Sequence, residues 1–141
     1  MVEWKYNVKR YAYPEEYGDY KEGIRRILIA DGNRLFRELI KQVIIDHYHS
    51  VVTSEASNER EFFDELCRYT FDAILLDLGL SEDKGLSVLK KLMIVDSNIP
   101  VVIMSLFPDE QYEENIYRAG YSEYVSKVNL MKELIPALER I

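Results

Sequence analysis

The apolar run Ala73-Ile74-Leu75-Leu76 is followed directly by the carboxylate Asp77 and then by a polar, glycine-containing loop at 78–85. Such a short and almost unbroken run is typical of a central strand in a parallel sheet, because both faces of that strand are covered. In open α/β sheets, functional groups usually lie in the crevice outside the carboxyl ends of the strands. Asp77 is therefore the first candidate functional residue, and the alternative is a surface aspartate that caps the next helix.

The rest of the chain repeats this alternation of a short apolar strand and an amphipathic helix. Strands are expected at 27–30, 51–53, 71–77, 100–104 and 122–126, and helices at about 35–44, 59–67, 86–93, 109–119 and 130–140. Five such units with short connections predict an α/β fold of the flavodoxin-like class. Its five-stranded parallel sheet has the order 2-1-3-4-5 and carries helices on both faces.

Two helices carry local details that can be tested. Cys67 follows Phe63 and Leu66 on one helical face, which predicts a thiol in the core. Pro136 lies deep in the last helix and removes a backbone hydrogen bond, so this helix should be kinked or should begin later than its apolar pattern suggests.

With 141 residues, the chain is long enough for one domain and a tail. The aromatic side chains of residues 1–22 lie among charges with little aliphatic content. We expect a mobile N-terminal extension over 1–22 and one domain over 23–141. The alternative is a segment whose aromatic side chains dock on this domain, on a second copy or on a partner.

Composition excludes several classes of function. The net charge of −7 argues against nucleic acid as a partner, because binding to a phosphate backbone draws on clustered Lys and Arg. No apolar run approaches the roughly 20 residues of a membrane span, and the N-terminus has no apolar signal core, so a cytoplasmic protein is expected. The lone Cys67 and the His47/His49 pair indicate neither a disulfide nor a zinc site.

The predicted sheet order brings four strand ends together, with Asp31, Asp77, Ser105 and Lys127 at them. Two carboxylates, a hydroxyl and an ammonium group suit a phosphoryl group and a hard divalent cation such as Mg²⁺. A carboxylate can itself be the nucleophile, which would give an aspartyl-phosphate.

These motifs resemble the receiver domain of two-component response regulators over about residues 24–141. The matching segments are the strand and acidic turn at 28–37, the strand at 75–78 with Gly85, the strand at 100–105, and 119–127 with Tyr124 and Lys127. The acidic turn and residues 55–58 are most similar to receivers of the NarL/LuxR type, which precede a helix-turn-helix DNA-binding domain. No such domain lies in these 141 residues.

The resemblance implies that Asp77 accepts phosphate from a histidine kinase or a phosphotransfer protein. It also implies that Asp31, Asp77 and the backbone carbonyl of Gly79 hold Mg²⁺. The residues that bind the phosphoryl group and act as the switch would be Ser105, Lys127 and Tyr124. Phosphorylation would then change one surface, formed by the helix at 109–119, the strand at 122–126 and the last helix. This surface would contact a second copy in a homodimer, an output domain or a downstream protein. Such a domain is no ordinary enzyme and at most catalyses its own phosphotransfer and dephosphorylation.

The chain departs from the family pattern at the metal site and near the phosphoacceptor. Gly32 stands where receivers have the second acid, so the acidic pair is degenerate and Mg²⁺ binding should be weak. Leu106 replaces a small residue and would act as an access gate to Asp77, while Ser81 and Val128 replace prolines.

Two alternative functions remain open. One is a pseudo-receiver that acts as an interaction module independently of phosphorylation. The other, more remote, is a flavodoxin-like protein that binds a small molecule. The second is disfavoured because no glycine-rich phosphate loop follows the first strand.

Overall fold

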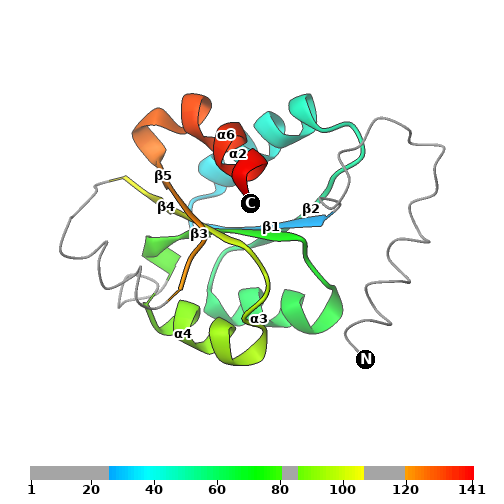
Figure 1. Cartoon of the computed structure of the whole chain (residues 1–141), viewed down its shortest axis with the longest axis vertical. Helices are drawn as coiled ribbons and strands as arrows, with labels where there is room; N and C mark the ends of the chain where they lie inside the picture. Colours follow the sequence, from blue (N-terminus) through cyan, green and yellow to red (C-terminus); the bar gives the residue numbers. More distant parts are fainter. Residues whose placement is uncertain (1–25, 81–85, 107–119) are drawn as a thin grey trace.

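Five parallel strands form one sheet in the computed structural model, which describes residues 26–80, 86–106 and 120–141 (Figure 1). The strands are β1 (Arg26–Ala30), β2 (Val52–Ala56), β3 (Ala73–Asp77), β4 (Val101–Ser105) and β5 (Glu123–Ser126). Their order in the sheet is β2-β1-β3-β4-β5, which confirms the predicted topology. All carboxyl ends therefore lie at one edge of the sheet.

Helices cover both faces of the sheet. The helices α2 (Arg34–His47) and α6 (Leu130–Arg140) lie on one face, and α3 (Glu59–Arg68) and α4 (Leu86–Val95) lie on the other (Figure 1). The alternation of side chains along each strand divides the core accordingly: Ile27 and Ile29 pack on the α2/α6 side, whereas Leu28 and Ala30 pack on the α3/α4 side.

The strand β3 lies at the centre of the sheet, between β1 and β4, and its four apolar residues are fully buried. In the register, Leu76 pairs with both Ala30 and Ile103, and Asp77 pairs with Met104. Asp77 thus ends the most enclosed strand. Two short 3₁₀ turns, η2 (Leu78–Leu80) and η3 (Lys127–Asn129), follow β3 and β5 at this edge.

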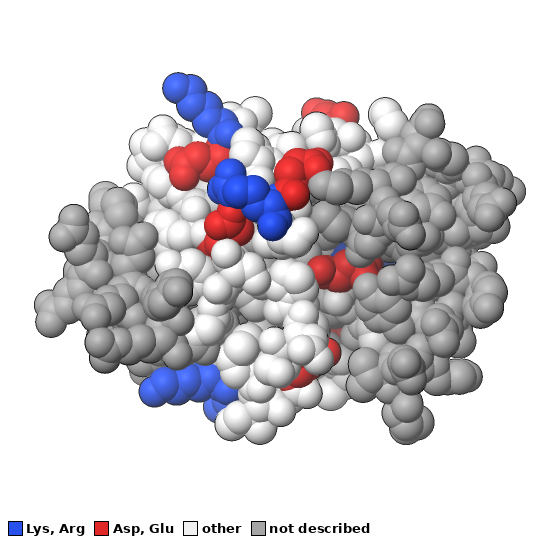
Figure 2. All heavy atoms as spheres, viewed as in Figure 1, with Lys and Arg blue, Asp and Glu red and all other residues white. Residues whose placement is uncertain are grey.

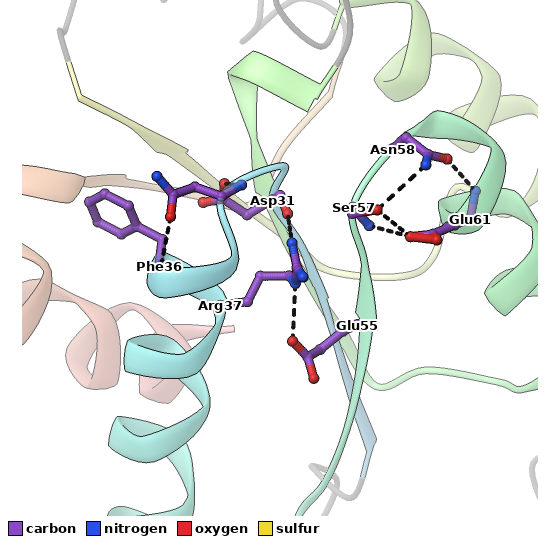
Figure 3. A network of polar contacts seen from close by, with 8 residues as sticks. Asp31, Phe36, Arg37, Glu55, Ser57, Asn58 and Glu61 are labelled. Carbon is purple, nitrogen blue, oxygen red and sulfur yellow. Dashed lines mark hydrogen bonds and ion pairs between the residues drawn. The ribbon is translucent and has the colours of Figure 1, made fainter.

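Asparagine side chains fix the start of both helices that follow β1 and β2. The side chain of Asn33 accepts a hydrogen bond from the backbone N–H of Phe36, and that of Asn58 accepts one from Glu61. The Glu61 carboxylate in turn accepts the backbone N–H of Ser57 at 2.8 Å (Figure 3). The helix expected at about 59–67 thus begins where the sequence pattern predicts.

The prediction for Cys67 is wrong, and so is the late start that was one of the two alternatives for the last helix. Cys67 is exposed, because only Phe62 of α3 is fully buried while Phe63 and Leu66 pack partly against the core. The last helix does not begin late: α6 starts at Leu130 and continues through Pro136. Pro136 lies on the exposed side, and the buried residues Leu134, Ala137 and Leu138 anchor the opposite side.

Several expected features lie outside the described residues. They are the N-terminal extension at 1–22, most of the loop after β3 with Ser81 and Gly85, and the polar helix at 109–119. Within the described ranges, no helix combines the length and the apolar character needed to cross a bilayer.

Replacing Pro136 with alanine should stabilise the protein. An interior proline costs about 3 kcal/mol relative to alanine, and the freer unfolded chain offsets up to about 1 kcal/mol, so we expect the free energy of unfolding to rise by about 2 kcal/mol. Urea denaturation measures this change. Pro100→Ala, just before β4 and outside any helix, should bring no comparable gain. A loss of stability in Pro136→Ala would show that the proline ring makes favourable contacts.

Candidate functional site

Asp31, Asp77 and Lys127 meet at the carboxyl edge of the sheet. The Nζ atom of Lys127 lies 2.6 Å from Oδ2 of Asp31 and 2.9 Å from Oδ1 of Asp77. Asp31 follows β1, Asp77 ends β3 and Lys127 follows β5, so the lysine side chain reaches across the end of β4. Exposed fractions of 1% for Asp31, 13% for Asp77 and 4% for Lys127 show that these charges are largely removed from water and depend on one another.

Backbone contacts hold Asp31 firmly in place. Its N–H donates to the carbonyl of Ala56 at 3.0 Å, and its Oδ1 accepts the N–H of Asn33 at 2.8 Å. Nη1 of Arg37 donates to the Asp31 carbonyl at 2.8 Å, while Nε of Arg37 donates to Glu55 at 3.0 Å (Figure 3). The turn between β1 and α2 is therefore tied to β2 by both main chain and side chain.

The second carboxylate oxygen of Asp31 differs from the first. Oδ2 is buried and receives no well-directed hydrogen bond, although the Lys127 ammonium group lies beside it. Its stabilisation is therefore mainly electrostatic. A hard cation could bind at such an oxygen.

The two oxygens of Asp77 have different partners. Oδ1 faces Lys127, and Oδ2 accepts the backbone N–H of Gly79 at 3.1 Å. Burial raises the pKa of the Asp77 carboxyl, and the negative charge of Asp31 raises it further, while the hydrogen bond and charge of Lys127 and the Gly79 N–H act in the opposite direction. A Cβ atom on Gly79 would lie only 2.8 Å from Oδ2, so any side chain at this position would displace the Asp77 carboxylate.

The other predicted site residues lie on or directly after the strands β4 and β5. Ser105 ends β4 and pairs in register with Ser126. The ring of Tyr124 in β5 lies 6.3 Å from that of Tyr121, and both pack partly against the core on the α3/α4 side. Leu106, which follows Ser105, is 41% exposed. Direct contacts thus join Asp31, Asp77, Lys127 and Gly79.

Phe36 belongs to this site, although the sequence pattern identified it only as part of an apolar helix face. The Nζ atom of Lys127 lies 4.4 Å from the centroid of the Phe36 ring. Phe36 lies in the first turn of α2, directly after the acidic turn, and this position would have been enough to identify it as a candidate. The sequence pattern likewise did not indicate that Arg37 supports the turn that carries Asp31.

The carboxylates at this site are the type of ligand that a divalent cation prefers, but the described residues supply only two of them. Asp31 and Asp77 offer hard carboxylate oxygens, yet no group of three or more His, Cys, Asp or Glu able to hold a metal occurs in the described part of the chain. Position 32 has room for a further ligand, because a Cβ atom there would meet only the Ser57 carbonyl at an ordinary 3.5 Å.

Comparison with known proteins gives the family of this fold and site. Residues 27–139 match the model of the response regulator receiver domain. The transcriptional regulatory protein PhoP of Escherichia coli K12 is 26% identical over 116 residues, which are 82% of this chain and 51% of PhoP. The chain thus spans about half the length of the curated relatives it matches.

Solved structures with the same fold include a LuxR-family response regulator and a CheY-like receiver. The regulator from Aurantimonas sp. has a TM-score of 0.74 and 25% identity, with 82% of this chain and 83% of the other covered. The receiver from Methanospirillum hungatei has a TM-score of 0.74 and 18% identity, covering 82% of this chain and 91% of the other.

Replacing Asp77 with asparagine should stabilise the metal-free protein at neutral pH. Because the folded pKa of Asp77 is raised, ionised Asp77 costs stability above this pKa, and the cost disappears below the unfolded pKa of about 3.9, where the carboxyl is neutral in both states. Asp77→Asn should therefore melt higher than the parent at pH 7 in EDTA, and the difference should vanish toward pH 3. Asp64→Asn, exposed on α3, serves as the control. A lower melting temperature at pH 7 would show that pairing with Lys127 outweighs burial.

Proposed function

The chain belongs to the response regulator receiver domain family, and we propose on this basis that Asp77 accepts a phosphoryl group in two-component signalling. The observation that carries the proposal is the Lys127 ammonium group, 2.9 Å from Asp77 and 2.6 Å from Asp31. Receiver domains are signalling domains rather than classical enzymes. The chemistry proposed here is accordingly transfer onto the domain's own carboxylate.

The donor in this proposal is a phosphohistidine of a histidine kinase or a phosphotransfer protein. An Asp77 oxygen attacks the phosphorus atom, a P–O bond forms, and the P–N bond breaks as the imidazole nitrogen leaves with the bonding electron pair. Lys127 offsets the negative charge of the phosphoryl oxygens, and it is already in position before the reaction. The hydrogen bond from Gly79 to Oδ2 orients the carboxylate.

Receiver domains generally bind Mg²⁺, which neutralises charge on the phosphoryl oxygens. In this chain the carboxylates of Asp31 and Asp77, with the Gly79 carbonyl, would hold the cation. Gly32 supplies no carboxylate. We therefore expect binding weaker than in receivers that have both acids.

The proposed switch uses Ser105 and Tyr124. The Ser105 hydroxyl would bond to the phosphoryl group, and Tyr124, which is only partly buried, would change rotamer. These changes would bias the surface of β5, α6 and residues 109–119 toward a second copy, an output domain or a downstream protein. The likeness to a LuxR-family regulator supports an output of the NarL/LuxR type.

The described surface gives little support for nucleic acid as a partner of this chain. Figure 2 shows acidic and basic side chains interspersed where α2 and α6 lie, without a continuous basic patch among the described residues in view. The net charge of −7 argues in the same direction and is compatible with a protein partner.

The alternative is a pseudo-receiver that works without phosphorylation. Two observations favour it: the glycine at position 32, and the ion pairs of Lys127 with both carboxylates, which satisfy the lysine before any phosphoryl group arrives.

Intact-mass measurement after treatment with acetyl phosphate and Mg²⁺ separates the two functions. Phosphorylation predicts the gain of one phosphoryl group by the parent and none by Asp77→Asn. An unchanged mass in both proteins would favour the pseudo-receiver, and a gain retained in Asp77→Asn would place the acceptor elsewhere.

Gly32→Asp should tighten Mg²⁺ binding, because the added carboxylate has room beside the Ser57 carbonyl. We expect a gain of roughly tenfold in affinity from the extra charged ligand, measured by calorimetric titration. Gly32→Asn fills the same space without a charge and should give a smaller gain. Equal affinities for the parent and Gly32→Asp would indicate that another acid, such as Glu82 or Asp83, already acts as the ligand.

Leu106→Ala should accelerate both phosphorylation and dephosphorylation of Asp77, because a smaller side chain beside Ser105 admits phosphoryl donors and water more readily. Since Leu106 is exposed, its truncation should change stability little. Time courses with acetyl phosphate measure both rates. Unchanged rates together with a loss of a few kcal/mol, as for a buried leucine, would instead assign Leu106 a packing role.

A further inference from the structure

The ring of Phe36 lies against the ammonium group that joins the two carboxylates. The distance from Lys127 Nζ to the ring centroid is 4.4 Å, within the range of about 6 Å over which a cation is attracted to an aromatic face. Lys127 therefore has two anionic partners and one aromatic partner. The ring limits the contact of the ammonium group with water, in keeping with its exposed fraction of 4%.

The position of the ring is fixed by the same turn that carries Asp31. The backbone N–H of Phe36 donates to Oδ1 of Asn33, and the N–H of Asn33 donates to Oδ1 of Asp31. The Phe36 side chain also packs against the core on the α2/α6 side. The contacts that place the carboxylate and the ring relative to each other do not involve Lys127 (Figure 3 shows Asp31 and Phe36).

A lysine side chain carries its ammonium group on a flexible stem of four carbons and has many competing conformers in water. A ring over its ammonium group disfavours conformers in which that group turns toward solvent, and it strengthens the remaining ion pairs by lowering the local dielectric. The position of the Lys127 ammonium group is especially important in this chain. Because Gly32 adds no carboxylate to hold Mg²⁺, Lys127 would supply most of the positive charge at the site when Mg²⁺ is weakly bound.

We infer that Phe36 is a positioning residue for the phosphoryl-binding lysine: its ring holds the Lys127 ammonium group between Asp31 and Asp77. This inference deepens the function proposed above, because the same lysine would meet the phosphoryl group. The positioning itself is a property of the unphosphorylated protein and can be measured there.

Proton exchange of the Lys127 ammonium group, followed by ¹⁵N NMR on the full chain, tests the positioning without any phosphorylation. A covered ammonium group with two carboxylate partners exchanges slowly with water and gives a signal of its own, assigned by its loss in Lys127→Arg. Phe36→Leu, which keeps an apolar side chain without a ring, should speed the exchange about threefold or more. Phe36→Tyr, which keeps the ring, should not.

Phe63→Leu is the matched control, because Phe63 is also a partly buried phenylalanine but packs in the core on the α3/α4 side. It should leave the Lys127 signal unchanged even if it lowers the melting temperature. Equal exchange in the parent and Phe36→Leu, equal acceleration by Phe63→Leu, or the absence of a Lys127 signal from the parent would each overturn the inference.

The rate of phosphorylation by acetyl phosphate gives the functional consequence. We expect Phe36→Leu to be about threefold slower than the parent and Phe36→Tyr to match it. If the parent takes up no phosphoryl group, the proposed function fails while the exchange measurement still decides the role of Phe36. Faster exchange with an unchanged phosphorylation rate would overturn the link between positioning and transfer.

Discussion

One buried ammonium group, that of Lys127, ties together the ends of three strands. Two negative carboxylates beside each other in a region of low dielectric would repel each other, and removing charge from water is itself unfavourable. The Lys127 charge offsets both effects for Asp31 and Asp77 at distances below 3 Å. The arrangement retains an excess negative charge, so it attracts further positive charge, whether from a metal ion or a partner. Burial of this charge cluster is thus weak evidence for a gain in stability.

The β1–α2 turn supplies most of the order around this lysine. Within seven residues it provides the Asp31 carboxylate, the Asn33 cap, the Phe36 ring and the Arg37 guanidinium group. Arg37 links the turn to Glu55 on β2, and the Asp31 N–H links it to Ala56 (Figure 3). A rigid support behind the first contacts is what a preorganised charged site requires. Residues around the charge cluster therefore set the geometry of the Asp31 carboxylate and the Lys127 ammonium group.

The sequence was sufficient to predict the sheet and the central charges. Unbroken apolar runs identify buried parallel strands, and the known order of such sheets places Asp31, Asp77 and Lys127 at one edge. The sequence does not show which side of a helix faces inward when its apolar face is narrow. Cys67 on α3 is such a case, because it follows the apolar pattern and is nevertheless exposed. It also could not weigh Pro136 against the buried residues around it, because packing at Leu134, Ala137 and Leu138 overrides local propensity. Phe36 escaped notice because periodicity alone does not distinguish a core aromatic from one that faces a cation.

The two glycines beside the carboxylates differ in their capacity to change over evolutionary time. At position 79 any side chain would press against Asp77 Oδ2, so substitutions there disturb the carboxylate itself. At position 32 the backbone leaves space for a side chain. A single base change converts any glycine codon into one for aspartate or glutamate, and the backbone would accept the result. One base change at this codon would therefore place a carboxylate beside Asp31 without a backbone rearrangement.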